Sequence, residues 1–147
     1  MAMTYGDALA LAGVPVPAHL EASAEVPVLT GVQFQGDLAV VPVPLAYAAG
    51  ATVPVWPAGE VLPPEGVQVV HGEATGNTHW LHPGFGAAGV RWHRAALGLV
   101  TGVVTVPDGE TAFLVHTDEH GANGIGPGAY EIRRKREQHD EIALIAD

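Results

Sequence analysis

Residues 97–116 read LGLVTGVVTVPDGETAFLVH, and this stretch has the pattern of two strands joined by a turn. The run from Leu97 to Val106 is apolar and rich in valine and threonine, whose β-branched side chains favour extended backbone. Pro107-Asp108-Gly109 has the composition of a tight turn. The run from Thr111 to His116 returns as a second strand. We therefore expect an antiparallel hairpin that ends in a histidine.

Strands of the same kind are predicted on both sides of this hairpin, at residues 37–41, 66–72, 79–82, 129–136 and 142–145. Glycine and proline separate them, and the glycine-rich segment 121–128 is expected to be a turn. Short strands about a dozen residues apart, with little helix between them, are typical of barrels and sandwiches. The sequence therefore predicts an all-β domain over residues 35–147, either a small β-barrel or a two-sheet sandwich.

The first 34 residues have a different character. Short helical turns are predicted at residues 5–12 and 17–24. The tripeptide Val-Pro-Val occurs at 14–16, 26–28, 41–43 and 53–55, and proline restricts such segments to edge strands, bulges or extended chain. One interpretation is an irregular Pro-rich N-terminal arm that wraps its own domain or a neighbouring subunit. The other is a compositional bias of loops.

Composition narrows the function classes. The chain has 147 residues, of which 48% are hydrophobic and only 15% are charged, and it contains no cysteine. Thiolate metal sites and disulfides are therefore excluded. The net charge of −10 argues against a nucleic-acid-binding protein. No run approaches the roughly 20 apolar residues that a membrane-spanning helix needs, and the expected location is the cytoplasm.

The basic residues are unevenly distributed, since residues 1–90 contain no lysine or arginine. Four are consecutive, Arg133, Arg134, Lys135 and Arg136. This strip either pairs with acidic groups of the molecule or a partner, or is a solvated strand end. Because side chains alternate along a strand, the even-numbered residues of 130–136 form a face that begins apolar and ends basic. The odd-numbered residues alternate in charge, and we expect that face to be solvated.

Two segments carry candidate metal ligands. One is HGEATGNTH at residues 71–79, and the other is HTDEH at residues 116–120. Imidazole and carboxylate groups that converge from neighbouring strands suit a divalent ion such as Zn, Fe, Mn or Ni. The candidate ligands are His71, His79, His116, His120, Glu73 and Glu119. The alternatives are histidines that only bond loop backbone, or acid–base catalysis without metal.

The pairing of the first segment is left open by the sequence. A two-residue turn at Gly76-Asn77 places His71 opposite His82 and Glu73 opposite Trp80. A three-residue turn instead pairs Glu73 with His79. A slip of one residue exchanges the two faces of a strand, so the register decides which histidine joins the cluster.

Residues 35–147 resemble a family of small bacterial proteins to which we can attach no activity. The resemblance rests on Gln35-Gly36-Asp37, on the two histidine segments, and on Pro127-Gly128-x-Tyr130-Glu131-Ile132. Three positions depart from the family pattern, since Asn77 replaces a histidine, Asp118 replaces a glutamate, and His139 lies near where the pattern has a tyrosine. A looser likeness to cupins comes from histidine and glutamate on β-strands, although the cupin His-x-His spacing is absent.

Two functions are therefore expected as alternatives. The first is a metal-binding β-domain that uses the histidine and glutamate cluster. The second is a structural subunit that forms a homo-oligomer or larger assembly through the N-terminal arm, as the low charge density and basic strip suggest.

Overall fold

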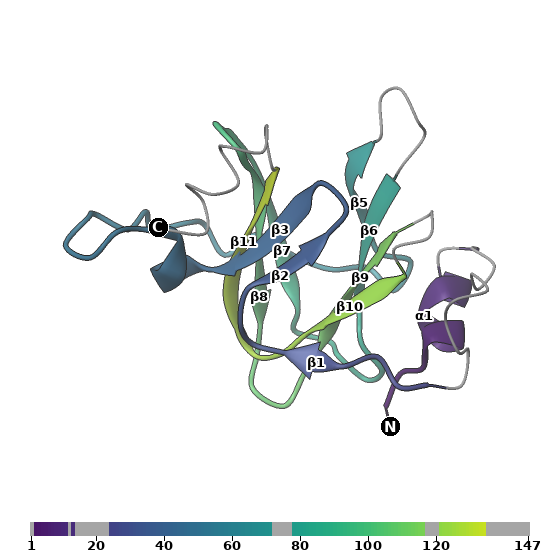
Figure 1. Ribbon diagram of the computed structural model, residues 1–147. Coiled ribbons are helices and arrows are strands. Elements are labelled where there is room, and N and C mark those ends of the chain that lie inside the picture. The colour runs from purple at the N-terminus through teal and green to yellow at the C-terminus, as the bar shows by residue number, and fades with distance from the viewer. Residues whose placement is uncertain (1, 12, 14–23, 72–77, 117–120, 135–147) are drawn as a thin grey trace.

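A computed structural model describes residues 2–11, 13, 24–71, 78–116 and 121–134, and the account below concerns these residues. They form two β-sheets that face each other (Figure 1). The all-β prediction is confirmed, and the architecture is the two-sheet sandwich. The predicted strand 142–145 and most of the predicted helical turn 17–24 lie outside the described residues.

The five-stranded sheet has the order β1 (Val28–Leu29), β10 (Ala122–Ile125), β9 (Ala112–His116), β6 (Thr78–Pro83) and β5 (Val67–His71). The six-stranded sheet has the order β2 (Gln33–Gln35), β3 (Leu38–Pro42), β11 (Gly128–Arg134), β8 (Val100–Val106), β7 (Arg91–Leu97) and β4 (Glu60–Val61). Helix α1 (Tyr5–Leu11) and the 3₁₀ helix η1 (Val43–Ala46) lie outside the sheets. All strand pairs are antiparallel except β1 with β10.

The predicted strand 97–106 is wrong at its beginning. Leu97 pairs with Val100, so the chain turns at Gly98-Leu99 and joins β7 to β8. Gly98 has a φ of 58°, a backbone conformation that glycine adopts without steric cost. The preceding segment, with its three charged or imidazole side chains, is a strand in spite of its polarity because Trp92 anchors it in the core.

The expectation that residues 121–128 form only a turn is also wrong. Ala122–Ile125 is strand β10, and it pairs with β9 along its whole length. Ile125 is fully buried and provides the apolar anchor. The prediction was based on the glycine content of the segment, which is typical of turns. Packing against β9 and β1 outweighs the low strand preference of glycine.

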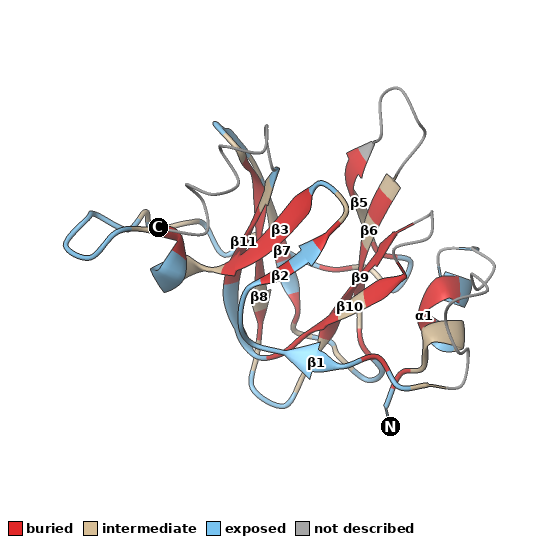
Figure 2. Ribbon diagram, viewed as in Figure 1, coloured by how far each residue is buried: buried red, intermediate tan, exposed pale blue. Residues whose placement is uncertain are grey.

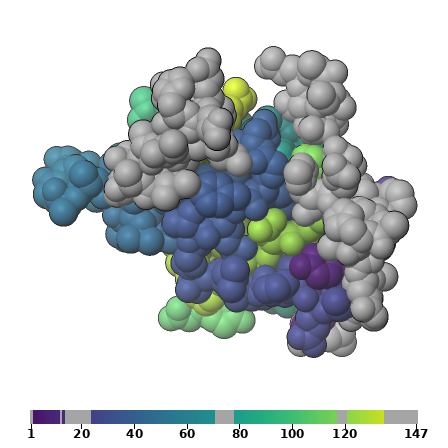
Figure 3. All heavy atoms as spheres, viewed as in Figure 1, coloured from purple at the N-terminus to yellow at the C-terminus, as the bar shows by residue number. Residues whose placement is uncertain are grey.

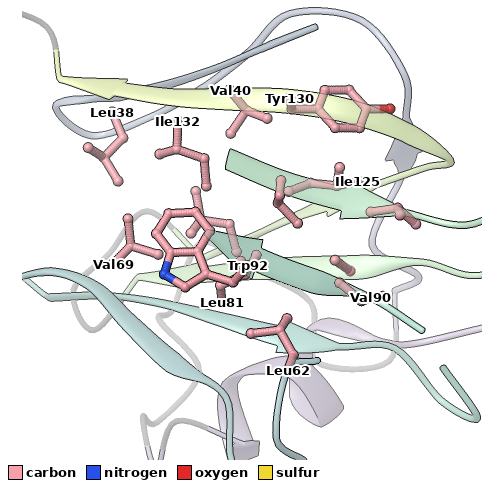
Figure 4. Packing of buried hydrophobic residues seen from close by; sticks show 14 of the residues in the cluster. Leu38, Val40, Leu62, Val69, Leu81, Val90, Trp92, Ile125, Tyr130 and Ile132 are labelled. Carbon is pink, nitrogen blue, oxygen red and sulfur yellow. The ribbon is translucent and has the colours of Figure 1, made fainter. Parts of the chain in front are cut away.

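The main core lies between the sheets, where the facing strands are largely buried (Figure 2). Side chains from most of the strands pack together there (Figure 4). Leu81 and Leu114 enter it from the five-stranded sheet, and Val104, Tyr130 and Ile132 enter from the other. Burial of each such side chain stabilises the fold by roughly 1.5–3 kcal/mol. Trp92 lies across β8, where a Cβ at Gly102 would overlap its ring.

A second apolar cluster covers the outer face of the five-stranded sheet. Leu9 of α1 is fully buried there, and Met3, Ala8 and Val26 join it against Phe113, Val115 and Ala122. The described parts of the N-terminal segment thus pack on the sheet of their own chain. No helix within the described ranges has the length and apolar character needed to span a bilayer.

Candidate functional site

The tight turn between β2 and β3 builds one corner of the sandwich. Gln35 pairs with Leu38, so Gly36 and Asp37 form a two-residue hairpin loop. Gly36 has a φ of 56°, and a two-residue turn of type II′ needs this left-handed conformation at its first position. The turn lies at the upper end of the sandwich in Figure 1, next to β6 and β9. It places Asp37 beside the five-stranded sheet.

Two of the predicted ligands meet at this corner. His79 of β6 and His116 of β9 are directly opposite each other in the antiparallel ladder. Their ring centroids are 4.3 Å apart with an interplanar angle of 64°. Both side chains point between the sheets, since each lies two positions from a core leucine on its own strand. His79 is 0% and His116 is 1% exposed.

A chain of buried amides supports His79. Gln35 Nε2 donates to the Leu114 carbonyl at 2.7 Å and to Asn123 Oδ1 at 2.8 Å. Asn123 Nδ2 donates to Gln33 Oε1 at 3.3 Å, and Gln33 Nε2 donates to the Gly124 carbonyl at 2.8 Å. Because backbone carbonyls only accept, these contacts fix which atom of each amide is nitrogen. Gln35 therefore presents its oxygen to His79.

The partners of His79 fix its hydrogen-bonding roles. Its Nδ1 lies 2.9 Å from Gln35 Oε1, which only accepts, so Nδ1 carries a proton and donates. Its Nε2 lies 3.1 Å from Asp37 Oδ1. An ionised carboxylate also only accepts. The Asp37 side chain is 68% exposed, so the carboxylate that contacts Nε2 is open to solvent although the His79 ring is buried.

The other predicted ligands are placed only in part. His71 pairs with Thr78 in the ladder, next to the rung formed by Val70 and His79. Glu73, Glu119 and His120 lie outside the described residues. Within the ranges that the structure describes, no group of three or more histidine or acidic side chains is arranged to hold a metal ion.

Both predicted registers of the 71–82 hairpin are wrong. Val70, rather than Glu73, pairs with His79, and His71 pairs with Thr78 rather than His82. The connection therefore spans residues 72–77 instead of two or three. A bulge between Gln68 and Val70 shifts the register further along the strands. The residues Gly76-Asn77 favour a tight turn. The register of β5 against β6 is instead the one that keeps His79 on the buried face of β6.

His82 was not among the predicted ligands, yet it is 1% exposed. Neither ring nitrogen has a hydrogen-bond partner among the described residues. Burial lowers the pKa of His82. The neutral ring is therefore the native form, and its contribution to stability falls as the pH drops below the unfolded value of about 6.5.

The expectation of a solvated odd-numbered face on β11 is wrong. Glu131 is 0% exposed and accepts hydrogen bonds from Tyr47 at 2.5 Å and from Trp56 Nε1 at 3.0 Å. Arg133 donates to its second oxygen at 2.8 Å through Nε and 2.7 Å through Nη2. Burial, followed by the bond to Glu131, raises the pKa of Tyr47, which keeps the phenol as a donor. The segment 43–59 is thereby attached to the outer face of the six-stranded sheet.

The predicted basic strip is therefore divided. Arg133 pairs within the molecule, which is one of the two alternatives expected from the sequence. Arg134, the last residue of β11, is exposed. Lys135 and Arg136 lie outside the described residues.

Sequence reasoning did not single out the amide chain of Gln33, Gln35 and Asn123 or the carboxylate of Asp37. A signal was present for two of these residues, since Gln33 and Gln35 alternate with apolar Val32 and Phe34 directly before a Gly-Asp turn. In the structure the glutamines are buried and Phe34 is exposed, which reverses the usual assignment of faces.

Comparison with known proteins gives one match. The model of a family described as "Domain of unknown function (DUF8820)" matches residues 34–135. This range contains Gln35, Asp37, His79, His116 and Asn123. No curated protein and no solved structure matches the chain.

Proposed function

The chain belongs to the DUF8820 family, and we propose that it binds a divalent metal ion at the corner between the β2–β3 turn, β6 and β9. The first ligands in this proposal are Nε2 of His79 and the carboxylate of Asp37. His116, whose ring lies against that of His79, becomes the third in this proposal only when the ion binds, because the described arrangement does not yet bring three ligands together.

The contact between His79 Nε2 and Asp37 Oδ1 carries the proposal. Since Nδ1 donates to Gln35, Nε2 is the ring nitrogen that faces Asp37 Oδ1, at 3.1 Å. A proton or a metal ion between these two atoms makes the contact favourable. Two ligand atoms that each lie about 2.0–2.2 Å from one ion are themselves about 3 Å apart.

The bond from His79 to Gln35 matches the arrangement of a metal-ligating histidine. Metal-ligating histidines commonly donate their other ring N–H to a carbonyl or carboxylate, which fixes the tautomer and the ring orientation. Gln35 Oε1 is such an acceptor, and backbone carbonyls and Asn123 hold it in place. The exposed Asp37 carboxylate leaves a path from solvent to the ion.

Glu73, Glu119 and His120 complete the ligand set in this proposal. The segment 117–120 directly follows His116 in the sequence, and the segment 72–77 directly precedes Thr78. Nitrogen and oxygen ligands without sulfur suit Zn, Fe, Mn or Ni. Protons compete for Nε2 of His79, so we expect metal affinity to fall as the pH is lowered.

Elemental analysis of protein purified without an affinity tag tests the proposal. We expect a stoichiometric amount of one divalent metal, and we expect Asp37→Asn to lose it while remaining folded, because Asp37 is exposed. Asp108→Asn is the matched control, since it alters an exposed aspartate in a different turn. Metal-free protein whose melting temperature responds neither to added zinc nor to a chelator would contradict the proposal.

An exposed apolar strip favours self-assembly as a second function. Val28 and Leu29 on β1 and Phe34 on β2 are 44%, 49% and 42% exposed, and both are edge strands. The segment that carries them lies on the molecular surface in Figure 3. Edge strands with exposed apolar side chains are favourable surfaces for pairing with a second copy.

Static light scattering tests this assembly. We expect a homo-oligomer that Leu29→Lys dissociates and that Leu45→Lys, at an equally exposed site away from the strip, leaves intact. A monomer at tens of micromolar wild-type protein would exclude the assembly.

A further inference from the structure

We propose that a second site, an anion-binding pocket, lies between β5 and the β7–β8 hairpin. A cavity of about 400 Å³ opens there, and Arg94 and Arg134 are the charged groups in its wall. Its volume is in the range of small-molecule sites. The proposal does not depend on the metal ion proposed above.

Arg94 is held in position by the bulge of β5. Its Nη1 donates to the Val69 carbonyl at 3.2 Å and its Nη2 to the Gln68 carbonyl at 2.5 Å. Its guanidinium carbon lies 5.7 Å from the ring centroid of Trp92. These contacts use two of the five N–H donors and leave the positive charge uncompensated. The remaining donors are oriented before any ligand arrives, which lowers the entropic cost of binding.

Arg134 lines the cavity from β11, which flanks β8 on the side away from β7 and Arg94. Its backbone N–H donates to the Leu99 carbonyl at 2.9 Å, which fixes the end of β11 beside the β7–β8 turn. In the part of the chain that the structure describes, the only arginine with a carboxylate partner is Arg133, which pairs with Glu131, so Arg94 and Arg134 have none there. Two like charges that share one cavity are stabilised by an anion between them.

The rest of the wall defines the kind of anion. Val69 and Val100 are 3% and 6% exposed and contribute apolar surface, and Ala95 and Ala96 continue it. The pocket therefore suits a small organic anion in which a carboxylate or phosphate group is joined to a compact apolar body. Arginine binds both groups through paired N–H donors.

Residues that line the pocket neighbour residues of the proposed metal corner in the strand ladders. Val69 precedes Val70, which pairs with His79, and Arg134 pairs with Leu38, the residue after Asp37. A ligand that binds the arginines therefore lies on the same open end of the sandwich as the proposed metal ion.

Titration of the full-length protein with benzoate and with phenyl phosphate, followed by backbone amide NMR in the presence of EDTA, tests the pocket. The chelator removes any contribution of an anion that ligates a metal. We expect shifts of the Ala95, Ala96 and Gly98 amides, and the comparison of the two probes shows which acid group is preferred. Neutral benzamide should not shift these signals.

Substitutions then identify the charges that bind. Arg134→Gln changes an exposed side chain, and we expect it to weaken binding of the preferred probe about tenfold or more. Arg91→Gln is the matched control, because Arg91 is an exposed arginine of the same strand as Arg94 that instead donates to the Gly59 carbonyl. The proposal is wrong if neither anion shifts these amides at millimolar concentration, if benzamide binds equally well, or if both variants bind like the wild type.

Discussion

Replacing Glu131 with alanine is expected to destabilise the folded protein by about 3–5 kcal/mol. The substitution leaves Arg133, whose side chain is only 14% exposed, without its carboxylate. It also removes the acceptor of the Tyr47 hydroxyl and of the Trp56 ring nitrogen. Each unsatisfied buried group adds to the cost. The effect is large because one carboxylate joins the segment 43–59 to the six-stranded sheet.

Urea denaturation followed by tryptophan fluorescence measures this loss. Glu60→Ala is the control, since Glu60 is an exposed glutamate on edge strand β4, and it should change the free energy of unfolding by less than about 0.5 kcal/mol. The double variant Glu131→Leu, Arg133→Met should recover part of the loss, because replacing both partners leaves no isolated charge. Equal stabilities of Glu131→Ala and Glu60→Ala would show that the buried contacts do not hold this segment.

Replacing Gln35 with methionine is expected to have two separable effects. The free energy of unfolding should fall by about 2–4 kcal/mol, because the Leu114 carbonyl, Asn123 and His79 each lose a partner. If His79 binds a metal, affinity for that metal should also fall about 10–100-fold, as is typical when the group that orients a ligating histidine is removed.

Gln33→Met separates these effects. Gln33 is 6% exposed and belongs to the same amide chain, but its bonds are to Gly124 and Asn123 rather than to His79. We expect a similar loss of stability by chemical denaturation and little change in zinc affinity by competition with a chromogenic chelator. Equal zinc affinities in the two variants would mean that Gln35 does not orient a metal ligand.

The sequence predicted the fold best where local pattern and packing agree. The strands predicted at 37–41, 66–72 and 111–116 have β-branched residues next to turns that contain glycine, and the structure contains them with ends shifted by one residue. β7 and β10 were missed because their own residues are polar or glycine-rich. Both are strands because a single side chain, Trp92 or Ile125, is buried between the sheets.

The candidate site was predictable only in part. The approach of His79 to His116 follows from two histidines at facing strand ends, and the structure contains this pair. The register of β5 against β6 depends on a bulge between Gln68 and Val70, which no local pattern indicates. The contacts of Glu131 with Tyr47 and Trp56 join residues 84 and 75 positions apart in the chain. Those of Gln35 with His79, Leu114 and Asn123 span 44, 79 and 88 positions. Such contacts arise from the packing of segments that are distant in the sequence. For this reason the alternating charges on β11 predicted a solvent-exposed face, whereas Glu131 on that face is buried.

Anomalous diffraction from crystals of untagged protein soaked with zinc, with data recorded at the zinc absorption edge, tests the metal site most directly. We predict a peak between Nε2 of His79 and the Asp37 carboxylate, with His116 on the same ion. A well-ordered corner without a peak, in which His79 bonds Gln35 and Asp37 directly, would show that a proton occupies this position and would contradict the proposed function.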